Sequence, residues 1–241
     1  MTAWPPGYGL KWFEEIDSTN EEARRLALAG QQGPIWLTAT RQTAGRGRRG
    51  RSWETPSGNL AATLLIHPGR PESHWPQLSF VAAIAASDMA SSFAPDARIA
   101  LKWPNDVLAD GKKLAGILLE NAHGALAIGI GVNLEHHPAD TEFPATSFRA
   151  LGAQVPSAGD ALAPLAGAFA KWYEVWSVQG FAAIRDAWLA RAHGLGTRIR
   201  ARLVKEERSG MFEGIDDSGA LLLNEGFGRL SVLPAADIFF G

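Results

Sequence analysis

A short loop combines four arginines and three glycines within residues 45–51. Arginine presents several N–H donors in a fixed fork that matches carboxylate and phosphate groups. Glycine lets the backbone bend and lets a ligand approach it closely. We therefore expect a mobile cationic loop that folds around an anion, with Trp53 beside it to stack on a ring.

The same loop satisfies two nucleotide-binding patterns by letter, and we expect neither to apply. Gly45, Gly47 and Gly50 fit G-x-G-x-x-G, and residues 45–52 approach a P-loop. Both patterns work when the last glycine opens a helix whose free N–H groups meet the phosphate. Pro56 and Gly58 stand where that helix would begin, so the glycines have to serve another purpose.

A second cluster, Lys102-Trp103-Pro104-Asn105-Asp106, joins a strand end to a stiff turn. An amide and a carboxylate at the mouth of a sheet suit Mg²⁺ that arrives with phosphates, because this ion takes a few oxygen ligands and keeps water. The alternative is an Asx-type turn in which both side chains cap the backbone. Taken alone, the pentapeptide favours the turn. Trp103 flanks this charged segment and is a second tryptophan that we expect to reach a ligand.

Two further segments add weaker signals. Lys112 and Lys113 precede an apolar strand; Lys112 suits a solvated hairpin tip, whereas the stem of Lys113 can lie on apolar surface with its ammonium over a pocket. Gly116 leaves room beside that ammonium. Residues 129–133 end a strand with glycines that permit close approach, and Asn133 follows as a candidate ligand contact.

These side chains need elements that position them, and the pattern predicts a sheet with helices. Ser18 to Glu21 reads as a capping box before a helix over 19–29. Apolar runs predict strands over 35–40 and 59–66 on either side of the arginine loop, and helical spacing predicts a helix over 75–93. The remaining elements are four short strands over 99–103, 107–109, 114–120 and 125–131, then two amphipathic helices over 160–177 and 181–193.

After residue 194 the pattern changes to short alternating strands over 198–204, 211–215, 220–224, 229–233 and 238–240. Asp216-Asp217-Ser218-Gly219 supplies a tight turn between two of them. A small β-barrel is the natural interpretation. We expect an α+β fold with a catalytic domain over 1–194 and a barrel over 195–241.

Composition limits the chemistry. The chain has 241 residues, 46% of them hydrophobic, with a net charge of −2, so the arginines are a local feature and a general nucleic-acid coat is not expected. It contains no cysteine, which removes disulfides, thiolate zinc sites and a cysteine acyl-enzyme. The six histidines lack metal-ligand spacing. We find no signal peptide and no membrane-spanning run, and expect a soluble, cytoplasmic protein.

Together the parts supply the electrostatics of phosphoryl-linked activation: cations for phosphate charge, an Asn-Asp pair for a metal, and a loop that excludes water. Several segments also resemble biotin protein ligases, in the same order and at similar spacing. They are Asp17-Ser18-Thr19-Asn20, residues 41–53, Lys102-Trp103-Pro104-Asn105-Asp106, residues 113–118, residues 129–133 and, in the barrel, residues 214–221. The resemblance covers nearly the whole chain, and only the resemblance names biotin.

That resemblance implies a two-step reaction. Biotin and MgATP give biotinyl-5′-adenylate and pyrophosphate, and a lysine of a biotin carrier domain then takes the biotinyl group. It also implies a catalytic fold like that of class II aminoacyl-tRNA synthetases, with a mixed or antiparallel sheet, followed by an SH3-like barrel.

The resemblance assigns roles to individual residues. The biotin contacts would be Ser18, Thr19, Asn20, Gln42, Arg46 and Gly47, and Gly45 is counted with the cofactor-binding residues. Arg48 would hold the adenylate, and Lys113, with Gly116 beside it, would meet the carboxylate and the forming phosphoanhydride. Asn105 and Asp106 would serve Mg²⁺ and phosphate, and Asp106 is also a candidate to take the proton of the attacking amine. Trp53 and Asn133 would border the adenine.

The partner implied is a carboxylase carrier domain, and a strand edge could support a homodimer. Some family members begin with a DNA-binding helix-turn-helix, whereas this chain reaches its Ser-Thr-Asn element by residue 18, so we expect no repressor role and no DNA partner. The barrel departs from the family at Pro234-Ala235-Ala236-Asp237. The rival hypotheses are a lipoate or octanoate ligase of related fold and, from another class, a module that binds single-stranded nucleic acid.

Overall fold

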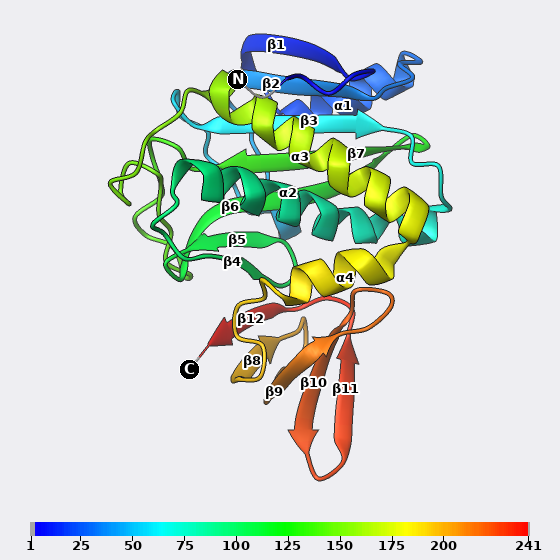
Figure 1. Ribbon diagram of the computed structural model, residues 1–241, viewed down its shortest axis with the longest axis vertical. Helices are drawn as coiled ribbons and strands as arrows, with labels where there is room; N and C mark the ends of the chain where they lie inside the picture. Colours follow the sequence, from blue (N-terminus) through cyan, green and yellow to red (C-terminus); the bar gives the residue numbers. More distant parts are fainter. Residues whose placement is uncertain (1–2, 241) are drawn as a thin grey trace.

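The computed structural model describes residues 3–240. A seven-stranded mixed sheet forms its larger part, in the order β1-β2-β3-β7-β6-β5-β4 (Figure 1). Only the pairing of β1 with β2 is parallel among the pairs in this sheet. The strands are β1 (Gly9–Ile16), β2 (Ile35–Gln42), β3 (Leu60–Ile66), β4 (Ile99–Lys102), β5 (Asp106–Ala109), β6 (Lys112–Ala122) and β7 (Ala125–Val132).

Helices cover both faces of this sheet, which explains why β3 is buried at every position and is apolar except for Thr63. Trp36 and Leu64 point to the face that α2 (Leu78–Phe93) and α3 (Ala158–Gln179) cover. The neighbouring residues Leu37 and Leu65 point to the opposite face, where Ala23 of α1 packs. This alternation follows from the two-residue period of a strand. The helices are α1 (Thr19–Leu28), α2, α3 and α4 (Phe181–Leu189), with short 3₁₀ turns at Arg48–Gly50 and Glu72–Gln77.

A second, five-stranded antiparallel sheet follows α4, in the order β11-β10-β9-β8-β12 (Figure 1). Its strands are β8 (Arg198–Arg202), β9 (Glu207–Ile215), β10 (Leu221–Gly226), β11 (Arg229–Leu233) and β12 (Asp237–Phe240). Its buried residues Phe212 and Ile238 belong to the same hydrophobic cluster as α2 and α3. The expected α+β fold with a small C-terminal β part is therefore confirmed.

The predicted helix and strand boundaries agree with the structure to within a few residues at most element ends. One local prediction, the capping box of the first helix, was wrong. The turn at 216–219 forms as expected, with Asp216 Oδ1 accepting from the N–H groups of Ser218 and Ala220. The capping box does not form. Ser18 occupies the N-cap of α1 without a side-chain hydrogen bond, and Glu21 instead binds Arg24 and Arg46. Among the helices of the described region, none has the length and apolar character that crossing a bilayer requires.

Trp103 differs from the expectation of an accessible ring, because its side chain is buried and its N–H group is used within the protein. The side chain is 1% exposed, and its Nε1–H donates to the carbonyl of Gly219 at 2.9 Å. Gly219 lies in the turn before β10, with a positive φ of 87°. The indole therefore connects the β4–β5 turn to the C-terminal sheet. This hydrogen bond helps to fix the position of the C-terminal sheet against that end of the larger sheet.

We expect Trp103→Phe to lower the free energy of unfolding by about 2 kcal/mol. The variant leaves the buried Gly219 carbonyl without its donor, a loss that typically costs 1–3 kcal/mol. Urea unfolding at pH 7 measures the change. Trp12→Phe is the matched control on the exposed edge strand β1, where a change within about 0.5 kcal/mol is expected. Equal effects of the two substitutions would contradict the fastening role.

Candidate active site at the end of the sheet

The antiparallel order brings several predicted segments to one end of the larger sheet. Strand β2 ends there, β3 and β6 begin there, and β7 ends there at Val132, while Asp106 at the start of β5 pairs with Gly116 near the start of β6. A cavity of about 440 Å³ lies at this end. Every residue that the sequence predicted for the site lines it except Gly45. Strand polarity and order thus assemble side chains that are far apart in sequence.

The floor of the cavity holds an ion pair between Lys113 of β6 and Asp106 of β5. Lys113 Nζ lies 2.6 Å from Asp106 Oδ1. Asp106 Oδ1 has no hydrogen-bond partner among the described residues, so the contact with Lys113 is an ion pair. Lys102 Nζ stands 4.0 Å from the other oxygen of the same carboxylate. One carboxylate therefore faces two ammonium groups.

Asn105 does not form the Asx-type turn that its pentapeptide favours. Its Nδ2–H donates across to the carbonyl of Ile117 in β6 at 2.6 Å, and its Oδ1 accepts from Arg48 at 3.1 Å. The amide is thereby fixed, and it holds the Arg48 guanidinium over the cavity. Burial lowers the pKa of Arg48, and the positive charges of Arg49 and Arg51 add to this, while Asp237 and Asp106 oppose it.

The glycines of β6 and β7 serve a tryptophan of the same chain. A Cβ on Gly131 would overlap the Trp53 ring, and one on Gly116 would come within 3.2 Å of it. Lys113 Nζ stands 5.4 Å from the centre of that ring, a cation–π distance. Trp53 thus lies flat over two glycines at the cavity wall, next to the ion pair.

Polar side chains at the start of α1 form the opposite wall. Gln42 Oε1 accepts from both the N–H and the hydroxyl of Thr19, at 2.8 and 3.0 Å. Asn20 Oδ1 accepts from Thr63 at 2.6 Å, and its Nδ2–H donates to Glu120 at 2.7 Å. A Cβ on Gly129 would overlap the Asn20 amide. The network fixes the orientation of these groups, which is what polar recognition of a neutral ligand head requires.

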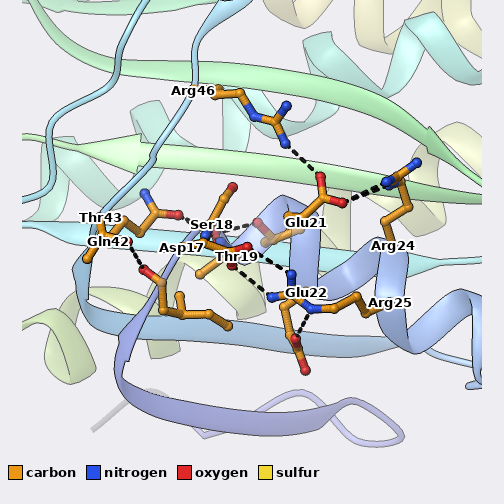
Figure 2. Close-up of polar contacts among 12 residues, drawn as sticks. Asp17, Ser18, Thr19, Glu21, Glu22, Arg24, Arg25, Gln42, Thr43 and Arg46 are labelled. Carbon is orange, nitrogen blue, oxygen red and sulfur yellow. Dashed lines mark hydrogen bonds and ion pairs between the residues drawn. The ribbon is translucent and has the colours of Figure 1, made fainter.

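Arg46 is held at the rim by an acidic residue of α1. Figure 2 shows its guanidinium pointing to Glu21, at 2.6 Å, while Arg24 approaches the other oxygen of that carboxylate at 2.7 Å. In the same view Arg25 binds Asp17 with two hydrogen bonds of 2.8 Å. The hydrogen bond from Arg25 lowers the pKa of Asp17 to about 2. The base of the loop is therefore tied to the N-terminal turn of α1.

The arginine loop itself is a compact turn in this structure. The N–H of Gly47 donates to the Arg51 carbonyl at 2.8 Å, and that of Trp53 donates to the Gly45 carbonyl at 3.0 Å. Gly45 lies outside the cavity, and a Cβ there would overlap the carbonyl of Trp53. Its role in the structure is to let the two arms of the loop meet.

Asn133 lines the cavity, but its amide serves the backbone. The side chain is buried, and Nδ2–H donates to the carbonyl of Thr146 at 3.0 Å. The backbone N–H of Asn133 donates to the carbonyl of Leu114 at 2.9 Å. The residue braces the end of β7, and any contact with a ligand stays a prediction.

Sequence reasoning missed Lys102, Phe143, Asp237 and Phe239, which also line the cavity. Lys102 is 7% exposed, and its Nζ lies 3.7 Å from the centre of the Phe143 ring. Burial lowers the pKa of Lys102 to about 8; the charges of Lys113 and Arg51 add to this, and the carboxylates of Asp106 and Asp237 partly oppose it. Lys102 belongs to the motif that predicted Asn105 and Asp106, so the signal was present. Asp237 gave none, because only the fold brings β12 here.

A resident metal has little support from side chains alone. Among residues 3–240 no group of three or more His, Cys, Asp or Glu could hold a metal ion. The predicted ligands Asn105 and Asp106 offer one amide and one carboxylate, and both face cations. This donor set fits a divalent ion that brings phosphate oxygens with it, as Mg²⁺ does.

Comparisons with known proteins identify the family of the chain. The Biotin/lipoate A/B protein ligase family matches residues 12–135, and the Biotin protein ligase C terminal domain matches residues 194–241. A biotin--[acetyl-CoA-carboxylase] ligase from Paracoccus denitrificans is 48% identical over 93% of this chain and 98% of its own. A bifunctional ligase/repressor from Bacillus subtilis is 35% identical over 98% of this chain and 75% of its own.

Solved structures share the fold. A biotin protein ligase from Aquifex aeolicus in complex with biotin and ATP superimposes with a TM-score of 0.84 over 97% of this chain and 99% of that one, at 24% identity. The match therefore extends over both sheets. With two family matches and relatives aligned over nearly its whole length, the chain belongs to the biotin protein ligase family.

Proposed function

We propose that this protein activates biotin with ATP to biotinyl-5′-adenylate and then transfers the biotinyl group to a lysine of a carboxylase carrier domain. The observation that carries the proposal is the pairing of Lys113 with Asp106 beside a cavity with both a cationic end and a fixed polar wall. The names of the relatives support biotin as the acid.

In the first step a carboxylate oxygen of biotin attacks the α-phosphorus of ATP. The bond from that phosphorus to its bridging oxygen breaks, and pyrophosphate leaves. Lys113 and Arg48 flank the cavity and would neutralise the charge that grows on the phosphoryl oxygens. ATP would enter with Mg²⁺, which Asp106 and Asn105 would help hold; the ion would shield phosphate charge there.

In the second step the carrier lysine attacks the acyl carbonyl, AMP leaves, and the amine loses a proton. Asp106 is the carboxylate on the cavity floor that could accept this proton. Thr19, Gln42 and Asn20 would hold the polar head of biotin, with Ser18 and Gly47 lining the same cavity. Trp53 lies against Gly131 and would border the adenine.

We further propose that residues 1–194 form the catalytic domain and residues 195–241 a separate barrel that completes the cavity. The reaction is assigned to the cytoplasm, where ATP and carboxylases meet. A homodimer would form through β1, the edge strand, on which Leu10 and Trp12 are exposed. Sedimentation of the wild type and of Trp12→Glu would test it: a concentration-dependent dimer lost in the variant is expected, and an unchanged monomer would end the proposal.

The deciding experiment is acid-dependent exchange of labelled pyrophosphate into ATP. Biotin should drive the exchange, whereas lipoate and octanoate should not. Exchange driven by either of the latter, without biotin, would move the protein to the related ligases. Nucleic-acid binding is disfavoured because Arg46, Arg49 and Arg51 are already paired with carboxylates of the chain.

We expect Lys113→Ala to lower exchange by at least about 100-fold, the scale seen when one preorganised charge stabiliser is removed. The fold should persist, because Lys102 still faces Asp106; circular dichroism checks this. Lys112→Ala, at the exposed hairpin tip, is the matched control and should keep its activity. Full exchange in Lys113→Ala would refute the assigned role.

We expect Lys102→Met to stabilise the free protein at pH 7 by about 1–3 kcal/mol, because the buried ammonium is poorly compensated. The pKa of Lys102 in the folded protein, about 8, lies below the ordinary lysine value of 10.5. Below about pH 8 the charged Lys102 lowers the free energy of unfolding by its full amount. This destabilisation decreases as the pH rises toward 10.5. The gain should shrink accordingly in urea unfolding between pH 7 and about pH 9.5. Exchange should show a KM for ATP raised about tenfold; lower stability with unchanged KM would contradict both claims.

A further inference from the structure

A carboxylate of the C-terminal sheet contacts two arginines of the arginine loop. Asp237 opens β12, and its Oδ2 lies 2.8 Å from Arg49 Nη1 while its Oδ1 lies 2.9 Å from Arg51 Nη2. Arg202 of β8 stands 3.6 Å away and is held by Glu142 at 2.5 Å. Two segments separated by 186 and 188 residues thus meet at one side chain.

Because of the geometry of the arginine loop, the contact with Asp237 also determines the position of Arg48. Arg49 has a positive φ of 57°, so the chain reverses at this residue. The Arg51 N–H donates to the Arg48 carbonyl at 3.2 Å, which closes the turn. Arg48 then points to Asn105 inside the cavity, while its two arginine neighbours point to Asp237. Because Arg49 and Arg51 are fixed at Asp237, the turn that carries Arg48 is fixed as well.

The charge and the partial exposure of these side chains favour ion pairs between Asp237 and the loop arginines that can form and break. Asp237 is 15% exposed at its side chain, whereas Arg49 is 35% and Arg51 56% exposed. Burial alone would raise the pKa of Asp237, but the hydrogen bond from Arg51 and the charges of Arg51, Arg49 and Arg48 outweigh it and hold the pKa below its usual value. The carboxylate is thus charged at neutral pH, and water can reach the arginines when the loop opens.

We propose that Asp237 is a positioning residue that latches the arginine loop against the C-terminal sheet and so keeps Arg48 over the cavity. Closure of the loop would retain the reactive acyl adenylate until the acceptor amine arrives. This last consequence rests on the proposed function, whereas the latch itself is a contact between two parts of the chain.

Trypsin tests the latch without any catalysis, because the loop offers cleavage sites after its own arginines. Asp237→Asn keeps the shape and removes the charge, so cleavage after Arg48, mapped by mass spectrometry, should accelerate roughly fivefold or more, as expected for the loss of partly exposed ion pairs. Asp237→Glu should restore most of the protection. Asp217→Asn is the matched control, since its carboxylate sits in the same sheet region, is exposed, and binds Arg185.

A variant in the loop separates loss of the latch from misfolding of the C-terminal sheet, because it leaves that sheet unchanged. Arg49→Gln with Arg51→Gln removes the latch from the other side and should accelerate cleavage after Arg48 to a similar extent. Adding Asp237→Asn should then change nothing further. Unchanged cleavage in Asp237→Asn, or fully additive effects in the triple variant, would overturn the latch.

Adenylate retention is the second measurement. In Asp237→Asn the release of labelled biotinyl-adenylate should quicken roughly fivefold while the KM for biotin in pyrophosphate exchange changes less than twofold, and Asp237→Glu should reverse this. Faster cleavage without faster release would overturn the retention role. Absence of biotin-dependent exchange in the wild type would defeat the proposed function while the trypsin result still judged the latch.

Discussion

The cavity has to hold several cationic side chains close together before any anion arrives, and this constraint organises the site. Arg46, Arg48, Arg51, Lys102 and Lys113 all line it. Two like charges about 4 Å apart repel by roughly 4 kcal/mol at an effective dielectric near 20, against about 1 kcal/mol in water. Each cation therefore needs an opposite charge or an aromatic face close by, and the fold supplies both from strands distant in sequence.

The cations of the cavity are not equally well paired with carboxylates, and this difference affects ligand binding. Lys113 has Asp106 at 2.6 Å, and Arg51 has Asp237 at 2.9 Å. Lys102 has a carboxylate only at 4.0 Å and lies over the Phe143 ring, and its pKa falls to about 8. A buried, underpaired cation raises the energy of the empty protein and gains most when a polyanion binds. Perturbed groups of this kind gather at functional sites for that reason.

Much of the fold and part of the site could be predicted from the sequence because the signals are local. The apolar run at β3 and the turn at Asp216 depend on near neighbours. Most of the site motifs stand at strand ends, and the strand order and pairing bring them together. What failed depends on distant partners. Glu21 leaves the capping box for Arg46, and Trp103 is buried because Gly219 offers a carbonyl.

The glycines show a subtler limit. A glycine that ends a strand permits close approach, but the sequence does not say of what. Gly131 accommodates the Trp53 ring, Gly129 the Asn20 amide, and Gly45 the opposite arm of its own loop. In each case the missing Cβ makes room for another part of the protein, and at Gly131 and Gly129 that part is a side chain that lines the cavity. The ligand would meet those side chains, and the glycines act one layer behind them.

The same logic explains why the C-terminal sheet belongs to the site. Trp103 fastens it to the β4–β5 turn, and that turn also carries Asn105 at the cavity. A shift of the sheet would therefore move Asp237 and Phe239 relative to the cations they face. Because Arg48 is held by Asn105 on one side and, through its neighbours, by Asp237 on the other, the loop stays closed only when both sheets keep their relative position. One hydrophobic cluster includes residues of both sheets and packs them together, so packing away from the cavity contributes to where its charges lie.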